Sequence, residues 1–464
     1  MPKKYVCSLG FGWISSIEAD DDRGVTQQVI RSYRQRNTGM KAFFVLGAVV
    51  AVSAMLSLGA AAQTTLQVAV VWGEDTQEWQ GFLAAGAAFE RLHPGVKVEF
   101  LPVMGWLGSN TEQTARLMTR VAGGVSPDVT LVDGMMVPQY AHAGLLLPLD
   151  KYIEASGVVE QDFIPAAWRQ TQWLGRQYAM TLHVDPNFPL VWNKEMFARA
   201  GLDADRGPET LAEYEEYFRK LTRIENDRAV QFGHRLWDVY GGANTIYTWG
   251  WIFGGDFYDF ENVRITAADP RNVEALEFIR DYYQRYQAYL TPEITFPTGM
   301  EAMRFATAAA VQQWRERYPD IGIGASFMPY AESGSPNPAW IGGHAIGILP
   351  DAPNPDLAWE FIRFITATEE GTLAFASASG AIPAYLPSPA HLAFLEDPIT
   401  TVYLEIAQRA RNVRPAVPVI ADYGVYLDEA FNSVLNGLQQ PADALAYVQR
   451  QVQMQLDEVL AGVR

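Results

Sequence analysis

Acidic and aromatic side chains lie directly after two of the strands that the sequence predicts in its first third. Trp72, Glu74 and Asp75 follow the first predicted strand, and Asp133 follows the third. Indole rings cover the apolar faces of small ligands, whereas carboxylates accept hydrogen bonds from hydroxyl or amine groups. These residues predict a binding site for a small polar molecule. Glu74 and Asp75 also have a structural interpretation, because acidic residues before a helix at Thr76 stabilise its positive end.

The sequence contains none of the HExxH, Walker A or GxSxG motifs of catalytic sites. Its only cysteine is Cys7, so the rest of the chain has neither disulfide nor thiol chemistry. The six histidines lack the spacing of metal ligands: His93, His142, His183, His234, His344 and His391. We therefore expect a protein that is not an enzyme and that has no cofactor and no metal site.

The order of predicted elements explains why the acidic loops matter. Short β-branched runs at 66–71, 96–101 and 128–132 predict strands, and helical spacing of apolar residues predicts helices at 76–92 and 111–121. A β-α-β-α-β order is typical of a parallel sheet with right-handed crossovers. Ligands bind such sheets beyond the carboxyl ends of the strands, which is where Trp72 and Asp133 fall.

A second set of elements follows in the rest of the chain. A strand is predicted at 178–182, with a break at Asp185-Pro186-Asn187, and an amphipathic helix at 209–222. Asp269 before Pro270 predicts a capped helix start, and Asn354-Pro355 repeats the pattern. A last helix is predicted at 441–460. Repeats and flexible linkers are absent, and about 400 residues predict two lobes joined by short strands.

The segment 40–63 has the features of an export signal. Lys41 provides a positive start, 42–58 is apolar, and Ala60-Ala61-Ala62 provides the small residues that signal peptidase requires. The alternative is a membrane anchor, since 42–62 is about long enough to cross a bilayer. Residues 1–39 form a doubtful leader, and translation starts at Met1 or Met40. Because no cysteine lies at the cleavage site, we expect no lipid anchor and a location outside the cytoplasm.

The chain is acidic, with a formal net charge of −18. Removal of residues 1–62 takes away seven basic and four acidic residues, which leaves a net charge of −21. A negative surface repels phosphate backbones and anionic lipids, so nucleic-acid and membrane-surface binding are not expected. Neutral or cationic small ligands remain compatible with this charge.

Taken in order, several segments resemble the extracellular solute-binding proteins of ABC importers, in particular the sugar-binding family that includes the maltose- and trehalose-binding proteins. The resemblance covers about residues 64–464 and rests on these segments: FERLHPGVKV (89–98), SPDVTLVDG (126–134), YAHAGLLLPL (140–149), LVWNKEMFARAGL (190–202), GMEAM (299–303), NPDLAWEFIRFIT (354–366) and SGAIP (379–383). The chain departs from the family at Trp192, where tyrosine is common, and before Trp314, where a glycine is usual.

The resemblance implies an α/β fold of the type II periplasmic-binding-protein kind. Two lobes, each with a mainly parallel sheet flanked by helices, are joined by a hinge of several strands. We expect an N-terminal lobe at 64–181 plus 320–366 and a C-terminal lobe at 182–319 plus 367–464. Such a hinge bends by small dihedral changes while each lobe stays rigid, and a ligand that contacts both lobes stabilises the closed form.

The resemblance also implies which residues contact the ligand. Asp185 falls where the family has an acidic contact near the hinge, and the segment at 237–240 resembles its acidic-aromatic ligand segment. Trp314 aligns with a stacking aromatic residue, and Trp340 and Tyr423 are further stacking candidates. The expected ligand-binding residues are Trp72, Glu74, Asp75, Asp133, Asp185, Trp237, Asp238, Tyr240, Trp314, Trp340 and Tyr423.

The function that the resemblance implies is that of a monomeric receptor that binds a di- or oligosaccharide and delivers it to the permease subunits of an ABC importer. Two alternatives remain open. A binder of polyamines or other cations on the same fold would use the same acidic loops, with aromatic rings around the amine. A glycosidase would also pair carboxylates with aromatic rings, and sequence spacing does not show the distance between its acid and base.

Overall fold

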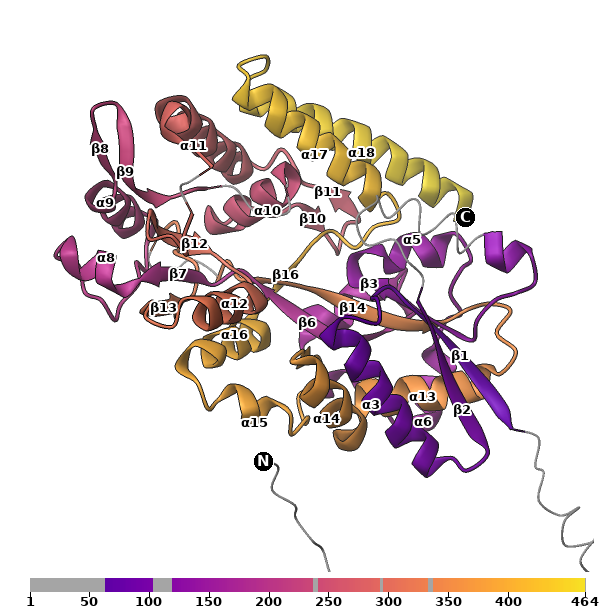
Figure 1. Ribbon diagram of the computed structural model, residues 1–464. Helices are drawn as coiled ribbons and strands as arrows, with labels where there is room; N and C mark the ends of the chain where they lie inside the picture. The colour runs from indigo at the N-terminus through magenta and orange to yellow at the C-terminus, as the bar shows by residue number, and fades with distance from the viewer. Residues whose placement is uncertain (1–62, 103–118, 237–240, 293–294, 333–336, 464) are drawn as a thin grey trace, which may run out of the picture. The chain divides into compact units, whose positions relative to one another are not determined.

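Two β-sheets organise the protein in the computed structural model, which describes residues 63–102, 119–236, 241–292, 295–332 and 337–463 (Figure 1). The first sheet has the order β15-β6-β14-β3-β1-β2, with β16 beside β14. Its strands are β1 (Thr64–Val70), β2 (Val96–Pro102), β3 (Val129–Asp133), β6 (Met180–Asn187), β14 (Trp340–Ile348), β15 (Ile382–Pro383) and β16 (Asn412–Val413). All of them belong to one compact unit, Thr64–Arg464.

The β-α-β start of the first sheet agrees with the prediction. β1 pairs in parallel with both β2 and β3, and α3 (Gln77–Leu92) connects β1 to β2. The helix begins at Thr76, whose hydroxyl accepts a hydrogen bond from the backbone amide of Trp79 at 3.2 Å. Phe82 and Phe89 on its inner face are fully buried. Most of the helix predicted at 111–121 lies outside the described residues.

The second sheet has the order β13-β7-β12-β9-β8. Its strands are β7 (Leu190–Asn193), β8 (Arg223–Glu225), β9 (Arg228–His234), β12 (Glu301–Phe305) and β13 (Ile323–Ser326). The helices that pack on or beside this sheet include α9 (Leu211–Leu221), α10 (Gly242–Ile252), α11 (Pro270–Tyr286), α17 (Ile420–Leu435) and α18 (Pro441–Val463). The last of these confirms the helix predicted at 441–460.

Strand directions differ from the expectation of mainly parallel sheets, because both sheets are mixed. In the first sheet, β14 pairs antiparallel with β3 and with β6. In the second sheet, β7 pairs antiparallel with β12 and with β13, and only β12 and β9 are parallel. The β-α-β pattern determines the direction only of strands that helices connect, so it does not extend to β14 or β7.

The strands β6 and β14 lead from the first sheet toward the second, and we call them the crossing strands (Figure 1). The break predicted at Asp185-Pro186-Asn187 is wrong, since β6 continues through these residues and all three pair with β14. Proline is tolerated there because the other neighbour, β15, pairs only with His183 and Val184. Residues Phe188 and Pro189 then separate β6 from β7.

Two predicted helix starts have different chemistry. The Asp269 carboxylate accepts a hydrogen bond from the backbone amide of Arg271 at 2.8 Å, which confirms it as the cap of α11. The helix α13 (Pro355–Ala367) also begins with proline, but the Asn354 side chain makes no cap hydrogen bond. The backbone amide of Asn354 instead donates to the buried Asp128 carboxylate at 2.7 Å. A cap pattern therefore predicts where a helix begins better than it predicts the bond.

The predicted lobe boundaries of 64–181 plus 320–366 and 182–319 plus 367–464 remain a proposal. Strand pairing puts Ile323–Ser326 in the second sheet, beside β7. The helix α14 (Glu369–Ser379) packs on α3, which belongs to the first sheet. If each lobe is defined by its sheet, the chain stays in the second lobe through β13, and α14 belongs to the first lobe.

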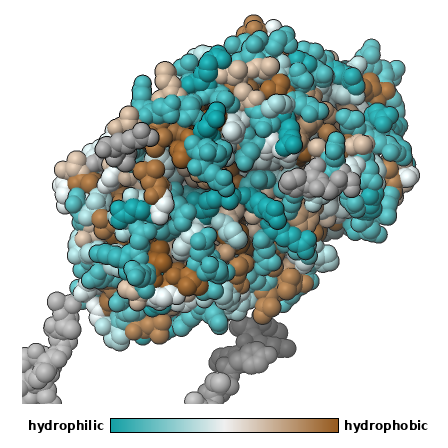
Figure 2. Space-filling model, turned by 180° about the vertical axis from the view of Figure 1, so that it is seen from behind, coloured by the Kyte–Doolittle hydropathy of each residue, from teal (hydrophilic) through white to brown (hydrophobic). Residues whose placement is uncertain are grey.

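The face shown in Figure 2 and the described helices bear on whether the chain contacts a bilayer. Figure 2 shows hydrophobic residues scattered among hydrophilic ones over the face in view. None of the helices in the described ranges is long and apolar enough to cross a bilayer. The predicted signal segment at 40–62 lies outside these ranges.

A buried histidine in the second sheet predicts how stability depends on pH. His234 is 1% exposed and lies 2.7 Å from the Tyr214 hydroxyl through Nδ1, and burial lowers its pKa to about 3. Between pH 6.5 and 3 the unfolded chain binds a proton at this residue and the folded chain does not. The free energy of unfolding should therefore fall by about 1.4 kcal/mol per pH unit from this residue alone as the pH drops through this range.

Urea unfolding followed by circular dichroism at several pH values between 7 and 4 measures this slope. The variant His234→Gln keeps a polar partner for Tyr214 and should show a shallower slope. An equal slope in both proteins would contradict the prediction.

Candidate functional site

Four of the predicted residues come together at the crossing strands. Trp72 lies after β1, Asp133 ends β3, Asp185 lies on β6, and Trp340 begins β14. Three further residues lie among them that the sequence did not predict for the site: His183, His344 and Arg414. We call these seven residues the crossing-strand cluster.

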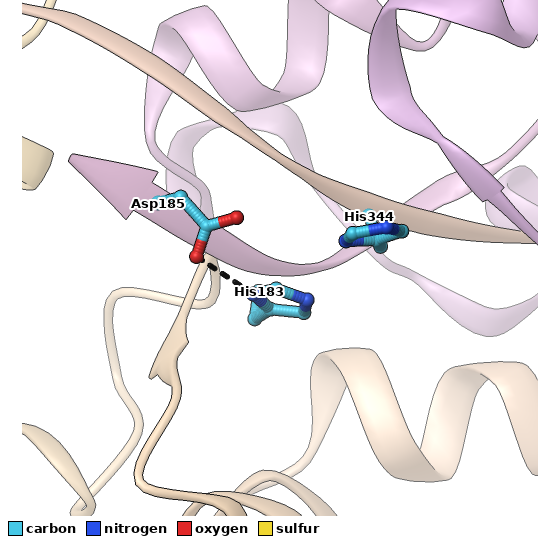
Figure 3. Close-up of side chains that lie close together, drawn as sticks. All are labelled: His183, Asp185 and His344. Carbon is cyan, nitrogen blue, oxygen red and sulfur yellow. Dashed lines mark ion pairs between the residues drawn. The ribbon is translucent and has the colours of Figure 1, made fainter. Parts of the chain in front are cut away.

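Strand register explains this assembly. His344 on β14 lies opposite Asp133 on β3 in one direction and opposite His183 on β6 in the other. Asp185 is two residues beyond His183, so both side chains lie on the same face of β6. Figure 3 shows His183, Asp185 and His344 close together, with the two imidazole rings nearly parallel.

Aromatic contacts hold the histidines in place. The Trp72 ring lies 4.6 Å from the His344 ring and 5.6 Å from the His183 ring, measured between centroids. The two imidazole rings lie 5.2 Å apart, with an angle of 23° between their planes. Trp72 is buried, and its other side packs on Phe82 of α3. This indole therefore connects the helix to the crossing strands.

Arg414 provides the positive charge of the cluster. Its guanidinium donates to both oxygens of Asp133, at 3.3 and 3.2 Å, and lies 5.7 Å from the centre of the Trp340 ring. The Asp133 carboxylate also accepts a hydrogen bond from the backbone amide of Met135 at 3.1 Å. Asp133 is thus largely committed to partners within the protein, which leaves Asp185 as the more available carboxylate.

The surrounding charges set the ionisation of the cluster. Desolvation of the carboxylate by the surrounding protein raises the pKa of Asp185. The nearby His183, His344 and Arg414 outweigh this effect and hold the pKa below its usual value. Burial, together with His183 and Arg414, lowers the pKa of His344 to about 4, although Asp133 and Asp185 act in the opposite direction. At neutral pH the cluster therefore presents an ionised Asp185, with a side chain that is 56% exposed, beside a neutral His344.

The two other acidic candidates in the first lobe lie at the surface. Glu74 and Asp75 are exposed in the turn between β1 and α3. The Thr76 hydroxyl, rather than either carboxylate, accepts the first amide hydrogen bond of the helix. Their position next to Trp72 is compatible with the ligand contact that the sequence predicts and with a stabilising effect on the helix.

The remaining candidates lie elsewhere. Trp314 on α12 (Ala308–Arg317) is partly buried, and its ring lies 4.9 Å from Phe296. Tyr423 on α17 is fully buried, and its hydroxyl donates to the Phe257 carbonyl at 3.0 Å. Trp340 is 1% exposed, so its ring forms part of the core as well as of the cluster. The segment with Trp237, Asp238 and Tyr240 lies outside the described residues.

Sequence reasoning missed the histidine pair because the two residues are far apart in the chain. Neither HVDP around His183 nor GGHAIG around His344 carries a spacing that predicts a shared site. Only the antiparallel register of β6 and β14 brings them together. Arg414 follows β16, which was not predicted as a strand.

Comparison with known proteins adds a family match. Residues 73–372 match the family described as bacterial extracellular solute-binding protein. The chain is 24% identical to an uncharacterized ABC transporter extracellular-binding protein of Pyrococcus horikoshii over 79% of this chain and 81% of that protein. It is 23% identical to a maltotriose-binding protein of Pyrococcus abyssi over 68% of this chain and 66% of that protein.

A solved structure supports the fold. The cyclic α-maltosyl-1,6-maltose binding protein of Arthrobacter globiformis superimposes with a TM-score of 0.70 at 20% identity, and the match covers 85% of this chain and 99% of that chain. This similarity confirms the predicted α/β fold of the type II periplasmic-binding proteins.

Proposed function

The chain belongs to the family of bacterial extracellular solute-binding proteins, and from this membership we propose that it binds a di- or oligosaccharide for delivery to the permease subunits of an ABC importer. Among its relatives is the maltotriose-binding protein of Pyrococcus abyssi, and the Arthrobacter globiformis structure is of a binding protein for a cyclic maltose oligomer. The observation on this chain that carries the proposal is the crossing-strand cluster.

The cluster has the chemistry that a sugar requires. Asp185 offers exposed carboxylate oxygens, which accept hydrogen bonds from two adjacent hydroxyl groups. Trp72 and Trp340 are buried beneath the cluster, where Trp72 contacts His183 and Trp340 lies against Arg414, and Arg414 is paired with Asp133. A site of a few convergent polar groups with aromatic walls is typical of small-molecule pockets.

Other predicted contacts complete the proposed site. Glu74 and Asp75 extend it from the first lobe, and Trp314 contributes a stacking surface from the second. Trp237, Asp238 and Tyr240 are proposed to contact the ligand as well. Tyr423 is fully buried and its hydroxyl donates to the Phe257 carbonyl, so any role in binding would be exerted from the core.

We propose further that the protein is a non-catalytic, monomeric receptor, and that residues 40–62 are the signal peptide that directs it out of the cytoplasm. We propose that the two lobes close on the ligand and that residues of both lobes contact it. Domain closure of this kind converts ligand contacts with both lobes into a preference for the closed state.

A cation is the second candidate ligand, favoured by the net charge of −18 and by the exposed Asp185 carboxylate. A polyamine would replace hydroxyl–carboxylate hydrogen bonds with ammonium–carboxylate ion pairs, and the indoles would surround its methylene groups.

Thermal unfolding of the purified chain with a panel of α- and β-linked oligosaccharides, spermidine and putrescine distinguishes the candidates. A ligand at 100 times its Kd adds about 2.7 kcal/mol to stability, so the sugar that binds should raise Tm by a few degrees while the polyamines should not. The reverse result would support the cation. Release of monosaccharide from the oligomers during incubation would identify a glycosidase instead.

A further inference from the structure

We propose that His183, Asp185 and His344 bind a divalent transition-metal ion, with Zn²⁺ as the expected occupant. Each residue offers one ligand atom, and the three atoms all lie within 4.8 Å of one another (Figure 3). This site goes beyond the proposed sugar binding and does not depend on it.

Both histidines have buried ring nitrogens that lack a hydrogen-bond partner among the described residues. His183 is 4% exposed; its Nε2 is buried without a hydrogen-bond partner among the described residues, and its Nδ1 faces the Asp185 carboxylate at 3.6 Å, beyond hydrogen-bond length. Nδ1 of His344 is also buried without a partner in the described part of the chain. Buried polar groups are nearly always hydrogen-bonded, and an imidazole nitrogen left without a partner loses the interaction that it has with water. A metal ion would satisfy one nitrogen of each ring, because an imidazole binds an ion through a single nitrogen.

The distances between the ligand atoms are close to those of a metal site. His183 Nδ1 lies 3.6 Å from a carboxylate oxygen of Asp185, close to the roughly 3.3 Å that separates two ligand atoms of a tetrahedral zinc ion with bonds of about 2.0–2.1 Å. The rings of His183 and His344 are held side by side by the register of β6 and β14. The three ligand atoms lie within 4.8 Å of one another, so binding would require the third atom to move closer by side-chain rotation.

The ligand types select the ion. Two imidazoles and one carboxylate suit zinc and its neighbours in the first transition series, whereas magnesium and calcium prefer sites made of oxygen ligands alone. Three protein ligands leave a fourth position open, as in catalytic rather than structural zinc sites. Because Asp185 is 56% exposed, this position is accessible to water or to a ligand hydroxyl.

The charges around the site permit a cation. Arg414 is the one positively charged side chain of the cluster, and Asp133 lies 3.2 Å from its guanidinium and balances it. The Trp72 ring packs against both imidazoles and brings no charge to the site. A metal ion would therefore add its charge beside Asp185 without an unbalanced arginine next to it.

Isothermal titration of the full chain with Zn²⁺, without a histidine tag and after dialysis against a chelator, tests the proposal in the absence of sugar. Cys7→Ser serves as the background, because a thiol in the leader would also bind zinc. We expect one zinc ion per chain, with a Kd at least about 100-fold lower than in the double variant His183→Gln/His344→Gln. Co²⁺ should give the visible absorption of a tetrahedral or five-coordinate site, which the double variant lacks.

The matched control is His142→Gln, which removes an exposed histidine outside the cluster and should leave zinc affinity unchanged. Circular dichroism and urea unfolding of the double variant show whether it remains folded. Zinc binding of equal strength in the folded double variant, or no zinc binding by the parent chain, would overturn the proposal. Either outcome leaves the proposed sugar binding standing, because that is measured without metal.

Discussion

Replacing Gly343 by alanine should lower the free energy of unfolding by at least about 3 kcal/mol. Gly343 lies in the middle of β14 with φ of +131°, a conformation that residues with a side chain rarely adopt. A Cβ atom there would lie 2.2 Å from the His183 carbonyl oxygen and 2.9 Å from the Val184 Cα. Both contacts are with the backbone of the neighbouring crossing strand, so a change of rotamer cannot relieve them.

Urea unfolding followed by circular dichroism measures this loss. Gly95→Ala is the matched control, because Gly95 has φ of +95° but no atom within 4 Å of the added methyl group. It should cost only the backbone strain, about 1–2 kcal/mol. Equal costs at the two positions would show that the close approach of β6 and β14 does not matter for stability.

Replacing Asp185 by alanine should weaken binding of the preferred sugar by about 10- to 100-fold, since hydrogen bonds to a charged group contribute roughly 1.5–3 kcal/mol each. Asp185 is exposed and lies at the centre of the cluster. Asp356→Ala, which removes an exposed carboxylate at the start of α13, should leave affinity unchanged. An Asp185→Ala variant that is folded and binds the sugar normally would exclude Asp185 from the site.

The variant Asp185→Asn separates the two candidate ligands. The amide keeps a hydrogen-bond acceptor of the same size but removes the charge. A sugar should therefore retain more affinity with asparagine than with alanine, whereas a polyamine should lose similar affinity in both variants. The comparison requires only titration calorimetry of the two variants.

Local patterns predicted the first sheet well. The strands and helix at 66–101 follow from periodicity and from turn residues, and the structure places β1, α3 and β2 there. The cap at Asp269 is a similarly local feature, because one carboxylate and the next two residues determine it. Such features depend on neighbours in sequence, so they can be read without knowing the rest of the fold.

The course and the pairing of the crossing strands could not be predicted from local sequence patterns. Pro186 predicts a break, yet β6 continues because only one of its edges needs hydrogen bonds at that point. The direction of β14 depends on pairing between segments that are far apart in the chain. The histidine pair and Arg414 depend on that pairing too, which is why the sequence predicted the acidic residues of the cluster but not their partners.

Aromatic residues were the least predictable part of the site. Indole and phenol rings serve equally as core and as ligand walls, and spacing does not separate these roles. Tyr423 is fully buried with its hydroxyl bonded to backbone, and Trp340 is nearly so. Trp72 is buried too, yet its contacts with His183 and His344 make it part of the cluster.

Isothermal titration of the purified chain with linear and cyclic malto-oligosaccharides and manno-oligosaccharides tests whether the protein is a sugar receptor. We expect at least one di- or oligosaccharide to bind with a stoichiometry of one per chain, and we expect Asp185→Ala to weaken this binding while Asp356→Ala does not. Absence of binding to every saccharide in the panel, by a chain that circular dichroism shows to be folded, would contradict it.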